Sequence, residues 1–145
     1  AIKFNYENTP FFDLYWKDIE LILNKKYTKL IELNIELINY FKSILEINTE
    51  IIFSSNLNIN SNGSEKLYEI CKILEADTYL SGELGQNYLN LEIFEKNDIK
   101  IIFEKFQHPT YSQINSQFLP NMSIMDLLFN EGDNSINILK KCKNY

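Results

Sequence analysis

The chain of 145 residues contains no arginine, so its fourteen basic residues are all lysines, and twenty acidic residues outnumber them. Bidentate recognition of phosphate or carboxylate ordinarily uses the arginine guanidinium group, whose geometry lysine cannot reproduce. The net charge of −6 and the scattered lysines also differ from the clustered positive charge of a nucleic-acid-binding surface. We therefore expect no nucleic-acid partner.

Cysteine and histidine are scarce as well: the chain has two cysteines, Cys71 and Cys142, and one histidine, His108. Two cysteines without a partner motif are typical of free thiols in a reducing compartment, so we expect a cytoplasmic protein. No cysteine or carboxylate stands at metal-ligand spacing from His108, so we expect no metal and no other cofactor. No apolar run is long enough to span a bilayer, and no signal peptide is visible.

The hydrophobic content of 45%, including 14% aromatic residues, is sufficient for a packed core. The length predicts one domain, residues 1–145. Apolar residues at helical spacing predict two amino-terminal helices, over 10–24 and 28–46. The second has apolar residues on two sides, so we expect it to be well buried and its Asn34 to need a hydrogen-bond partner. Two short helices are expected near the carboxyl end, after Ser123 and from Asn134 onward.

The middle of the chain has the short β-branched and aromatic runs that are typical of strands. The predicted order is strand, helix, strand, helix and strand, over residues 49–55, 64–76, 77–82, 84–97 (broken near Asn90) and 99–106. Short links in a βαβαβ unit imply right-handed crossovers between parallel strands. The sequence therefore predicts an α/β fold with a three-stranded, mostly parallel sheet, two amino-terminal helices and further carboxyl-terminal helices.

Polar residues follow each predicted strand, and ligands of open parallel sheets bind at the carboxyl ends of strands. The first strand ends in Ser54-Ser55, the second in Ser81-Gly82, and the third leads to His108. Two interpretations of the turn from Ser81 to Gly85 remain open. Its N–H groups could hold an anion, or its glycines could serve a tight turn. The spacing matches neither a dinucleotide fingerprint nor a P-loop, which favours the turn.

Two further groups of residues have alternative interpretations. His108, with Tyr111 and Gln113 close behind, forms either an acid/base or substrate-orienting cluster or an ordinary surface loop. Ser123 and Asp126 have the S-x-x-D spacing of a capping box, which favours a structural role at a helix start.

Four segments together resemble the carboxyl-terminal part of the WbqC-like family: YTKLIELNIELI, IIFSSNL, ADTYLSGELGQNYL and HPTYSQINSQFLPNMSIMDLLFNEG. The similarity runs from about Pro10 to Leu139. It implies a cytoplasmic α/β protein of bacterial surface polysaccharide (O-antigen-type) biosynthesis, with a sugar-linked or amino-acid-like small-molecule substrate. Two functions stay open. One is a transferase that attaches an amino-acid or acyl group to a sugar, and the other is a non-catalytic binding or assembly module of the same pathway.

The resemblance also implies the site residues. His108 would be the catalytic acid/base, and the substrate-binding residues would be Ser54, Ser55, Ser81, Gly82, Gly85, Tyr88, Tyr111, Gln113, Asn121 and Asp126. Glu83 and Gln86 depart from the family pattern, which has a small residue or proline and a basic residue there. Family members usually begin with a segment of the type Q-P-x-Y-x-P-x-x-G-Y-F, and we expect this chain to lack it. Besides the substrate, a second copy of the chain is the partner that we consider.

Overall fold

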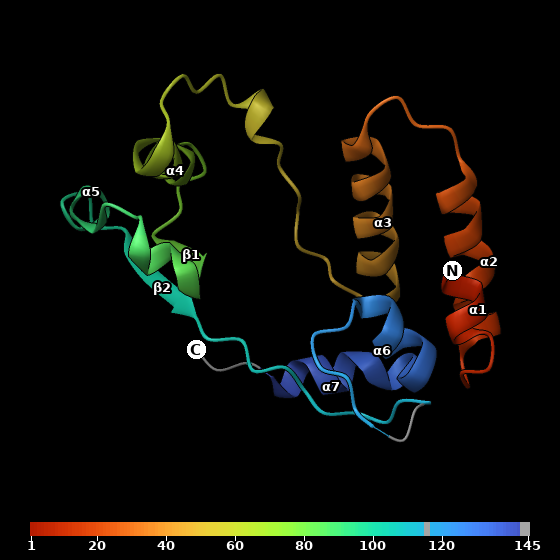
Figure 1. Ribbon diagram of the computed structural model, residues 1–145. Coiled ribbons are helices and arrows are strands. Elements are labelled where there is room, and N and C mark those ends of the chain that lie inside the picture. The colour runs from red at the N-terminus through yellow and green to blue at the C-terminus, as the bar shows by residue number, and fades with distance from the viewer. Residues whose placement is uncertain (115–116, 143–145) are drawn as a thin grey trace. The chain divides into compact units, whose positions relative to one another are not determined.

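The computed structural model describes residues 1–114 and 117–142, which fold as two compact units (Figure 1). Unit 1 contains Ala1–Thr49 and the described residues from His108 onward, and unit 2 contains Glu50–Gln107. The single domain expected from the chain length stays a prediction.

Unit 1 is helical, and both predicted amino-terminal helices are confirmed. The elements of unit 1 are α1 (Ile2–Tyr6), α2 (Phe12–Asn24), α3 (Leu30–Ile44), α6 (Ile124–Glu131), the 3-10 helix η3 (Gly132–Asn134) and α7 (Ser135–Lys141). The short helix α1 was not predicted, because five residues are too few to show an apolar period.

The core of unit 1 is aromatic. Phe12 and Ile19 of α2 pack with Leu128 and Phe129 of α6, and the ring centroids of Phe12 and Phe129 lie 5.2 Å apart. Tyr6 of α1 also contacts Phe129, with ring centroids 5.2 Å apart. Burying an aromatic side chain of this kind stabilises a fold by about 1.5–3 kcal/mol, so these contacts fix α1 and α2 against α6.

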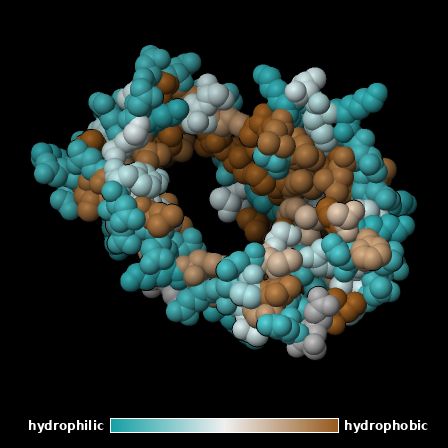
Figure 2. Space-filling model, in the orientation of Figure 1, coloured by the Kyte–Doolittle hydropathy of each residue, from teal (hydrophilic) through white to brown (hydrophobic). Residues whose placement is uncertain are grey.

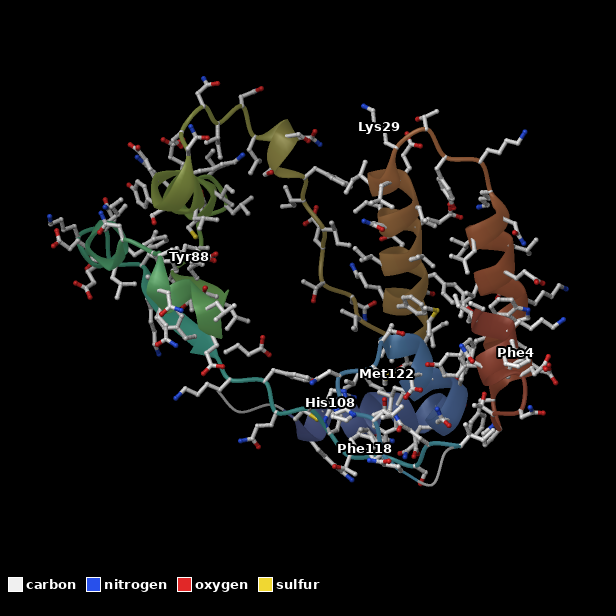
Figure 3. All side chains as sticks on the ribbon, in the orientation of Figure 1. Phe4, Lys29, Tyr88, His108, Phe118 and Met122 are labelled. Atoms are coloured by element: carbon white, nitrogen blue, oxygen red, sulfur yellow. The ribbon has the colours of Figure 1, made fainter. Side chains whose placement is uncertain are left out.

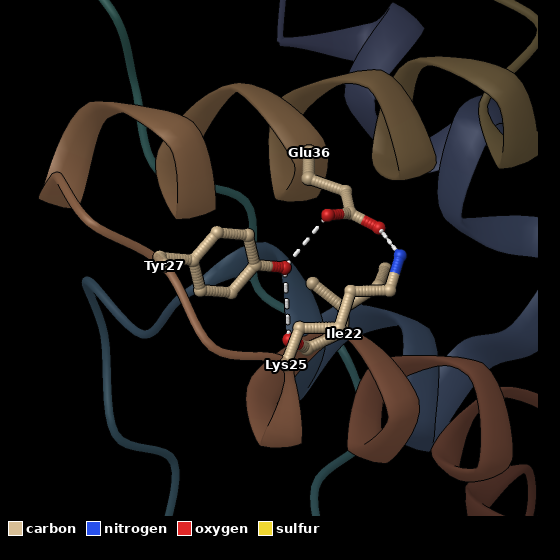
Figure 4. Close-up of polar contacts among 4 residues, drawn as sticks. All are labelled: Ile22, Lys25, Tyr27 and Glu36. Carbon is tan, nitrogen blue, oxygen red and sulfur yellow. Dashed lines mark hydrogen bonds and ion pairs between the residues drawn. The ribbon is translucent and has the colours of Figure 1, made fainter.

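Polar contacts join the end of α2 to α3 (Figure 4). The Tyr27 hydroxyl lies 2.9 Å from the carbonyl oxygen of Ile22 and 2.7 Å from Oε2 of Glu36. Lys25 forms an ion pair with the same carboxylate. These contacts tie the connection between the two helices to both of them.

The exposure of α3 differs from the prediction. This helix, which is described in full, has no fully buried side chain, and Leu30, Ile31 and Ile38 are exposed. Figure 2 shows apolar surface over α3. The prediction of a well-buried helix was wrong, because only one side of its wide apolar face packs within unit 1. Asn34 is exposed and therefore does not need the partner that a buried amide would require.

Unit 2 contains a small parallel sheet with short helices. Its elements are η1 (Ser54–Asn56), α4 (Gly63–Ile73), β1 (Thr78–Gly82), η2 (Glu83–Asn87), α5 (Leu91–Glu95) and β2 (Lys100–Glu104). The strands pair in parallel from Thr78 opposite Lys100 to Gly82 opposite Glu104. The predicted break near Asn90 is confirmed, because this residue separates η2 from α5. The core consists of Cys71, Phe94 and Ile99, with Tyr79 stacked on Phe94.

The predicted three-stranded sheet is wrong: over the described residues the sheet has two strands, although the broad α/β class is correct. Residues 49–53 form no strand, and Ile51, Ile52 and Phe53 are exposed. β-branched residues fit a pleated surface that is paired and half-buried, and their sequence alone does not supply a pairing partner. At 49–53 the apolar composition therefore predicted a strand that the chain does not form.

Candidate functional site

The predicted site residues are divided between the two units. His108, Tyr111, Gln113, Asn121 and Asp126 belong to unit 1, whereas Ser54, Ser55, Ser81, Gly82, Gly85 and Tyr88 belong to unit 2. A single site formed by all of them stays a prediction, so the geometry is given unit by unit.

Asp126 is the centre of the cluster in unit 1. It lies in the first turn of α6 and is only 5% exposed. Its Oδ2 accepts hydrogen bonds from the Tyr111 hydroxyl at 2.7 Å and from Nε2 of Gln113 at 2.8 Å. Ser123 is the N-cap residue of α6, but its side chain makes no capping hydrogen bond. The predicted helix start at Ser123 is therefore confirmed, but the capping hydrogen bonds are not formed, because the Asp126 carboxylate binds the preceding loop instead.

The Gln113 side chain positions that loop. Its Oε1 accepts a hydrogen bond from the backbone N–H of Leu119 at 2.8 Å, and its Nε2 donates to the Leu119 carbonyl at 3.0 Å. Asn130 of α6 adds a second connection. Its Oδ1 accepts from the N–H of Ile114 at 3.0 Å, and its Nδ2 donates to the backbone carbonyl of Asp126 at 2.8 Å. Side chains thus replace secondary structure in satisfying the loop backbone.

The two tyrosines near Asp126 are held in their neutral form. Burial, the charge of Asp126 and hydrogen bonding to its carboxylate raise the pKa of Tyr6 to about 12. Burial, followed by hydrogen bonding to Asp126 and by its charge, also raises the pKa of Tyr111. Both hydroxyls therefore act as hydrogen-bond donors at neutral pH and do not act as bases.

A pocket of about 370 Å³ opens beside this cluster within unit 1. It is lined by Phe4, Asn5, Tyr6, Gln113, Ile114, Leu119, Met122 and Asp126. The Phe4 side chain is 81% exposed and projects from α1 (Figure 3). Among these described lining residues, Asp126 carries the only formal charge. The pocket therefore combines a buried carboxylate, two amides and exposed aromatic surface.

His108 lies beside this cluster. Its Nδ1 is 2.8 Å from the carbonyl oxygen of Pro109, which implies that Nδ1 carries a proton and donates. The ring centroid lies 6.1 Å from that of Tyr111 and 6.0 Å from that of Phe118 (Figure 3). His108 thus contacts a direct partner of Asp126, and its acid/base role stays a prediction. Asn121 is exposed with φ of 62°, a left-handed conformation that asparagine tolerates.

In unit 2, Ser81 is buried near the end of β1, where its hydroxyl donates to the Gly82 carbonyl at 3.2 Å. A Cβ added to Gly85 would lie 2.0 Å from Oγ of Ser81, so a side chain at this position would displace the Ser81 hydroxyl. Gly82 has φ of −64°, and a Cβ there would meet nothing within 4 Å. Gly85 therefore serves the packing of the turn, whereas Gly82 has no comparable steric reason. Tyr88 is exposed.

The strand-end argument applies to fewer residues than expected. Ser54 and Ser55 lie in the exposed turn η1 and do not follow a strand. The strand β2 ends at Glu104, and His108, four residues later, belongs to the helical unit. Only Ser81 and Gly82 are strand-end residues, because the first predicted strand is not formed.

The pocket also contains residues that the sequence analysis missed. Phe4, Asn5 and Tyr6 come from α1, while Leu119 and Met122 come from the loop before α6. A helix of one turn gives no periodic signal, and an aromatic residue in a chain with ten phenylalanines and nine tyrosines does not stand out. No pattern available in the sequence would have selected them.

Residues 1–114 and 117–142 contain neither a metal-binding cluster nor a membrane-spanning helix. In that part of the chain, no group of three or more histidine, cysteine, aspartate and glutamate side chains is arranged to hold a metal ion. None of the described helices has both the length and the apolar character needed to cross a membrane.

Comparison with known proteins gives the family. The chain is 29% identical over 145 residues to Rv1507c of Mycobacterium tuberculosis, an uncharacterised protein, and the match covers 99% of this chain. It spans 63% of that relative, which is less than two thirds of its length. No solved structure matches the chain. The model of the WbqC-like protein family matches residues 1–138, and the chain belongs to that family.

Proposed function

We propose that this protein acts in the biosynthesis of a bacterial surface polysaccharide of the O-antigen type. In this proposal the Asp126 pocket binds the sugar to which an amino-acid or acyl group is transferred. The observation that carries it is the buried Asp126 carboxylate, with the Gln113 amide, in a pocket that also exposes the Phe4 ring.

These side chains suit the two kinds of surface that a sugar ring presents. An aromatic ring can pack on the apolar C–H face of a sugar. A carboxylate accepts hydrogen bonds from hydroxyl groups, whereas an amide both donates and accepts them. The volume of about 370 Å³ falls in the range of about 300–1,000 Å³ that is usual for small-molecule sites. A monosaccharide unit is therefore a suitable occupant.

Transfer of an acyl group to a sugar forms a new ester or amide bond as the leaving group departs. The attacking hydroxyl or amine loses a proton in this step, and a positioned base increases its rate by about 10²–10⁴-fold. Asp126 lines the pocket and is one candidate base, and His108, which contacts Tyr111, is the other. The protonated Tyr6 hydroxyl, which hydrogen-bonds to Asp126, would accept a hydrogen bond from a substrate hydroxyl.

A binding or assembly module is the second candidate function, and the composition of the pocket favours it. The described lining residues include no serine, cysteine, lysine or histidine, so they lack the hydroxyl, thiol, amine and imidazole groups of these four residue types as covalent nucleophiles. The chain also spans only 63% of the mycobacterial relative. Under this function the pocket holds the sugar, and the reaction takes place elsewhere.

Titration with monosaccharides, followed by calorimetry, tests sugar binding. Asp126→Ala should weaken binding by about tenfold or more, because a charge-assisted hydrogen bond is lost. Asp13→Ala provides the matched control, since Asp13 is an exposed aspartate of α2 in the same unit. Equal affinities in the wild type and in Asp126→Ala would contradict the proposed pocket.

Mass spectrometry then separates the two functions. The protein is incubated with a sugar that binds and with an acyl thioester as the activated donor. A sugar product heavier by the acyl group indicates the transferase, whereas bound sugar without product indicates the module. Absence of sugar binding would contradict both.

A further inference from the structure

The charge of Asp126 has no cationic side-chain partner among the described residues. The two ion pairs over residues 1–114 and 117–142 are Lys25 with Glu36 and Lys96 with Glu92. Asp126 instead accepts from Tyr6, Tyr111 and Gln113, which are neutral donors. Buried carboxylates are ordinarily paired with a cation, because neutral donors compensate only part of the lost hydration.

We propose that the ligand supplies the missing positive charge: the sugar held in this pocket is an amino sugar whose free, protonated amine binds the Asp126 carboxylate. This inference rests on the proposed sugar-binding function and specifies its substrate class. It concerns one chemical group of the ligand, a primary ammonium, and one group of the pocket, the Asp126 carboxylate.

The geometry leaves a place for this ammonium group. Tyr111 and Gln113 donate to Oδ2 of Asp126, and the Tyr6 hydroxyl also hydrogen-bonds to this carboxylate. A carboxylate has about four acceptor positions on its two oxygens, so acceptor capacity remains for a ligand. Asp126 is 5% exposed and lines the pocket, so an ammonium group bound there would be largely removed from water. Removal from water strengthens its attraction to the carboxylate.

The rest of the described lining favours a cation over an anion. Phe4 and Tyr6 present aromatic rings, whose faces attract an ammonium group. No lysine is among the described lining residues, so a phosphate or carboxylate placed here would meet Asp126 without a compensating charge. The pocket therefore discriminates for an amine and against an anionic group of similar size.

Three matched sugars test this inference with the 145-residue chain. D-Glucosamine, D-glucose and N-acetyl-D-glucosamine differ at carbon 2, which carries an ammonium, a hydroxyl or a neutral amide group. At pH 6, isothermal titration calorimetry should give D-glucosamine at least about tenfold higher affinity than either neutral sugar, as expected for a charge-assisted hydrogen bond. In Asp126→Asn, which is close in shape but carries no charge, this preference should disappear, so that D-glucosamine and D-glucose bind with equal affinities.

A pH series on the unmodified protein gives a second measurement that does not depend on a variant folding. The affinity for D-glucosamine should fall as its amine loses its proton, while the affinity for D-glucose stays constant. D-Glucose binding as tightly as D-glucosamine would overturn the ammonium inference and leave the sugar pocket intact. A preference that persists in Asp126→Asn would overturn it as well. Binding of none of the three sugars would overturn both the inference and the proposed function.

Discussion

The two units bury polar groups in different ways. In unit 1, Asp126 and Asn130 are four residues apart on α6, and both bind the loop that precedes the helix. In unit 2, the buried Ser81 hydroxyl donates to the carbonyl of the next residue, and Gly85 leaves space for it. The first arrangement holds a buried charge beside a pocket, whereas the second packs a tight turn.

This difference indicates which unit of the protein contains a pocket for a ligand. The strand-end rule applies to open sheets in which the strand order reverses and a crevice forms. A sheet with two parallel strands has no such reversal, so its strand ends are ordinary turns unless another element supplies a crevice. The helix and loop of unit 1 supply a pocket without the help of a sheet.

The core of unit 1 should give the largest effect on stability. Phe129→Ala should lower the free energy of unfolding by about 3–5 kcal/mol, because Phe129 is fully buried against Phe12 and Tyr6. Phe4→Ala, in the same unit but highly exposed, should change it by less than about 0.5 kcal/mol. Urea denaturation measures both variants. Equal losses would show that the aromatic cluster does not form the core.

Substitutions of Asp126 and Ser81 compare how much the buried polar groups of the two units contribute to the free energy of unfolding. Asp126→Ala should cost about 1–3 kcal/mol, because the Tyr111 hydroxyl and the Gln113 amide lose their buried acceptor. Ser81→Ala should cost less, about 0.5–1 kcal/mol, because it removes one long hydrogen bond together with its donor. The reverse order in thermal unfolding would show that Asp126 does not organise unit 1.

The two glycines of unit 2 provide a matched pair. Gly85→Ala should destabilise by about 1–3 kcal/mol, because its methyl group would overlap Oγ of Ser81. Gly82→Ala should be neutral or stabilising by up to about 1 kcal/mol, since its φ suits alanine and the space is open.

A double-mutant cycle adds a control for this pair. Ser81→Ala should recover part of the loss caused by Gly85→Ala, because the overlapping hydroxyl is then absent. Strict additivity of the two substitutions in denaturant unfolding would show that the turn does not depend on this contact.

The last expected effect is confined to high pH and comes from the ionisation of Tyr6. Its pKa is raised from 10.0 to about 12 in the folded protein, so the unfolded chain loses this proton first as the pH rises. The contribution to stability is therefore fully present below about pH 10 and is lost between about pH 10 and 12. Tyr6→Phe should reduce the slope of unfolding free energy against pH in that interval. An unchanged slope would contradict the burial of Tyr6 beside Asp126.

The periodic parts of the fold could be predicted from the sequence. Apolar spacing located α2 and α3, and short β-branched and aromatic runs located β1 and β2. The prediction of a strand at 49–55 was wrong, because β-branched residues favour strand pairing but do not determine a partner strand. The prediction that α3 is well buried was wrong for a related reason. Its apolar residues occupy two sides of the helix, and the rest of unit 1 covers only one of them.

The candidate site could be predicted only in part. Tyr111, Gln113 and Asp126 were all among the expected residues, and the structure brings them into one hydrogen-bonded cluster. The capping pattern assigned Asp126 a different partner, because sequence spacing shows the nearest backbone donors and not the distant side chains that compete with them. Tyr6 lies 120 residues away from Asp126 in the chain, so only the fold shows that they meet.

The central claim, that unit 1 carries the ligand site around Asp126, is tested most directly by mapping amide chemical shifts. The ¹⁵N-labelled chain is titrated with D-glucosamine, and the shift of each assigned amide is followed. We predict that the changes concentrate at the pocket residues Tyr6, Gln113, Leu119 and Asp126. Changes confined to Ser81, Gly82, Gly85 and Tyr88, with the pocket amides unmoved, would contradict the account and place the site at the strand end of unit 2.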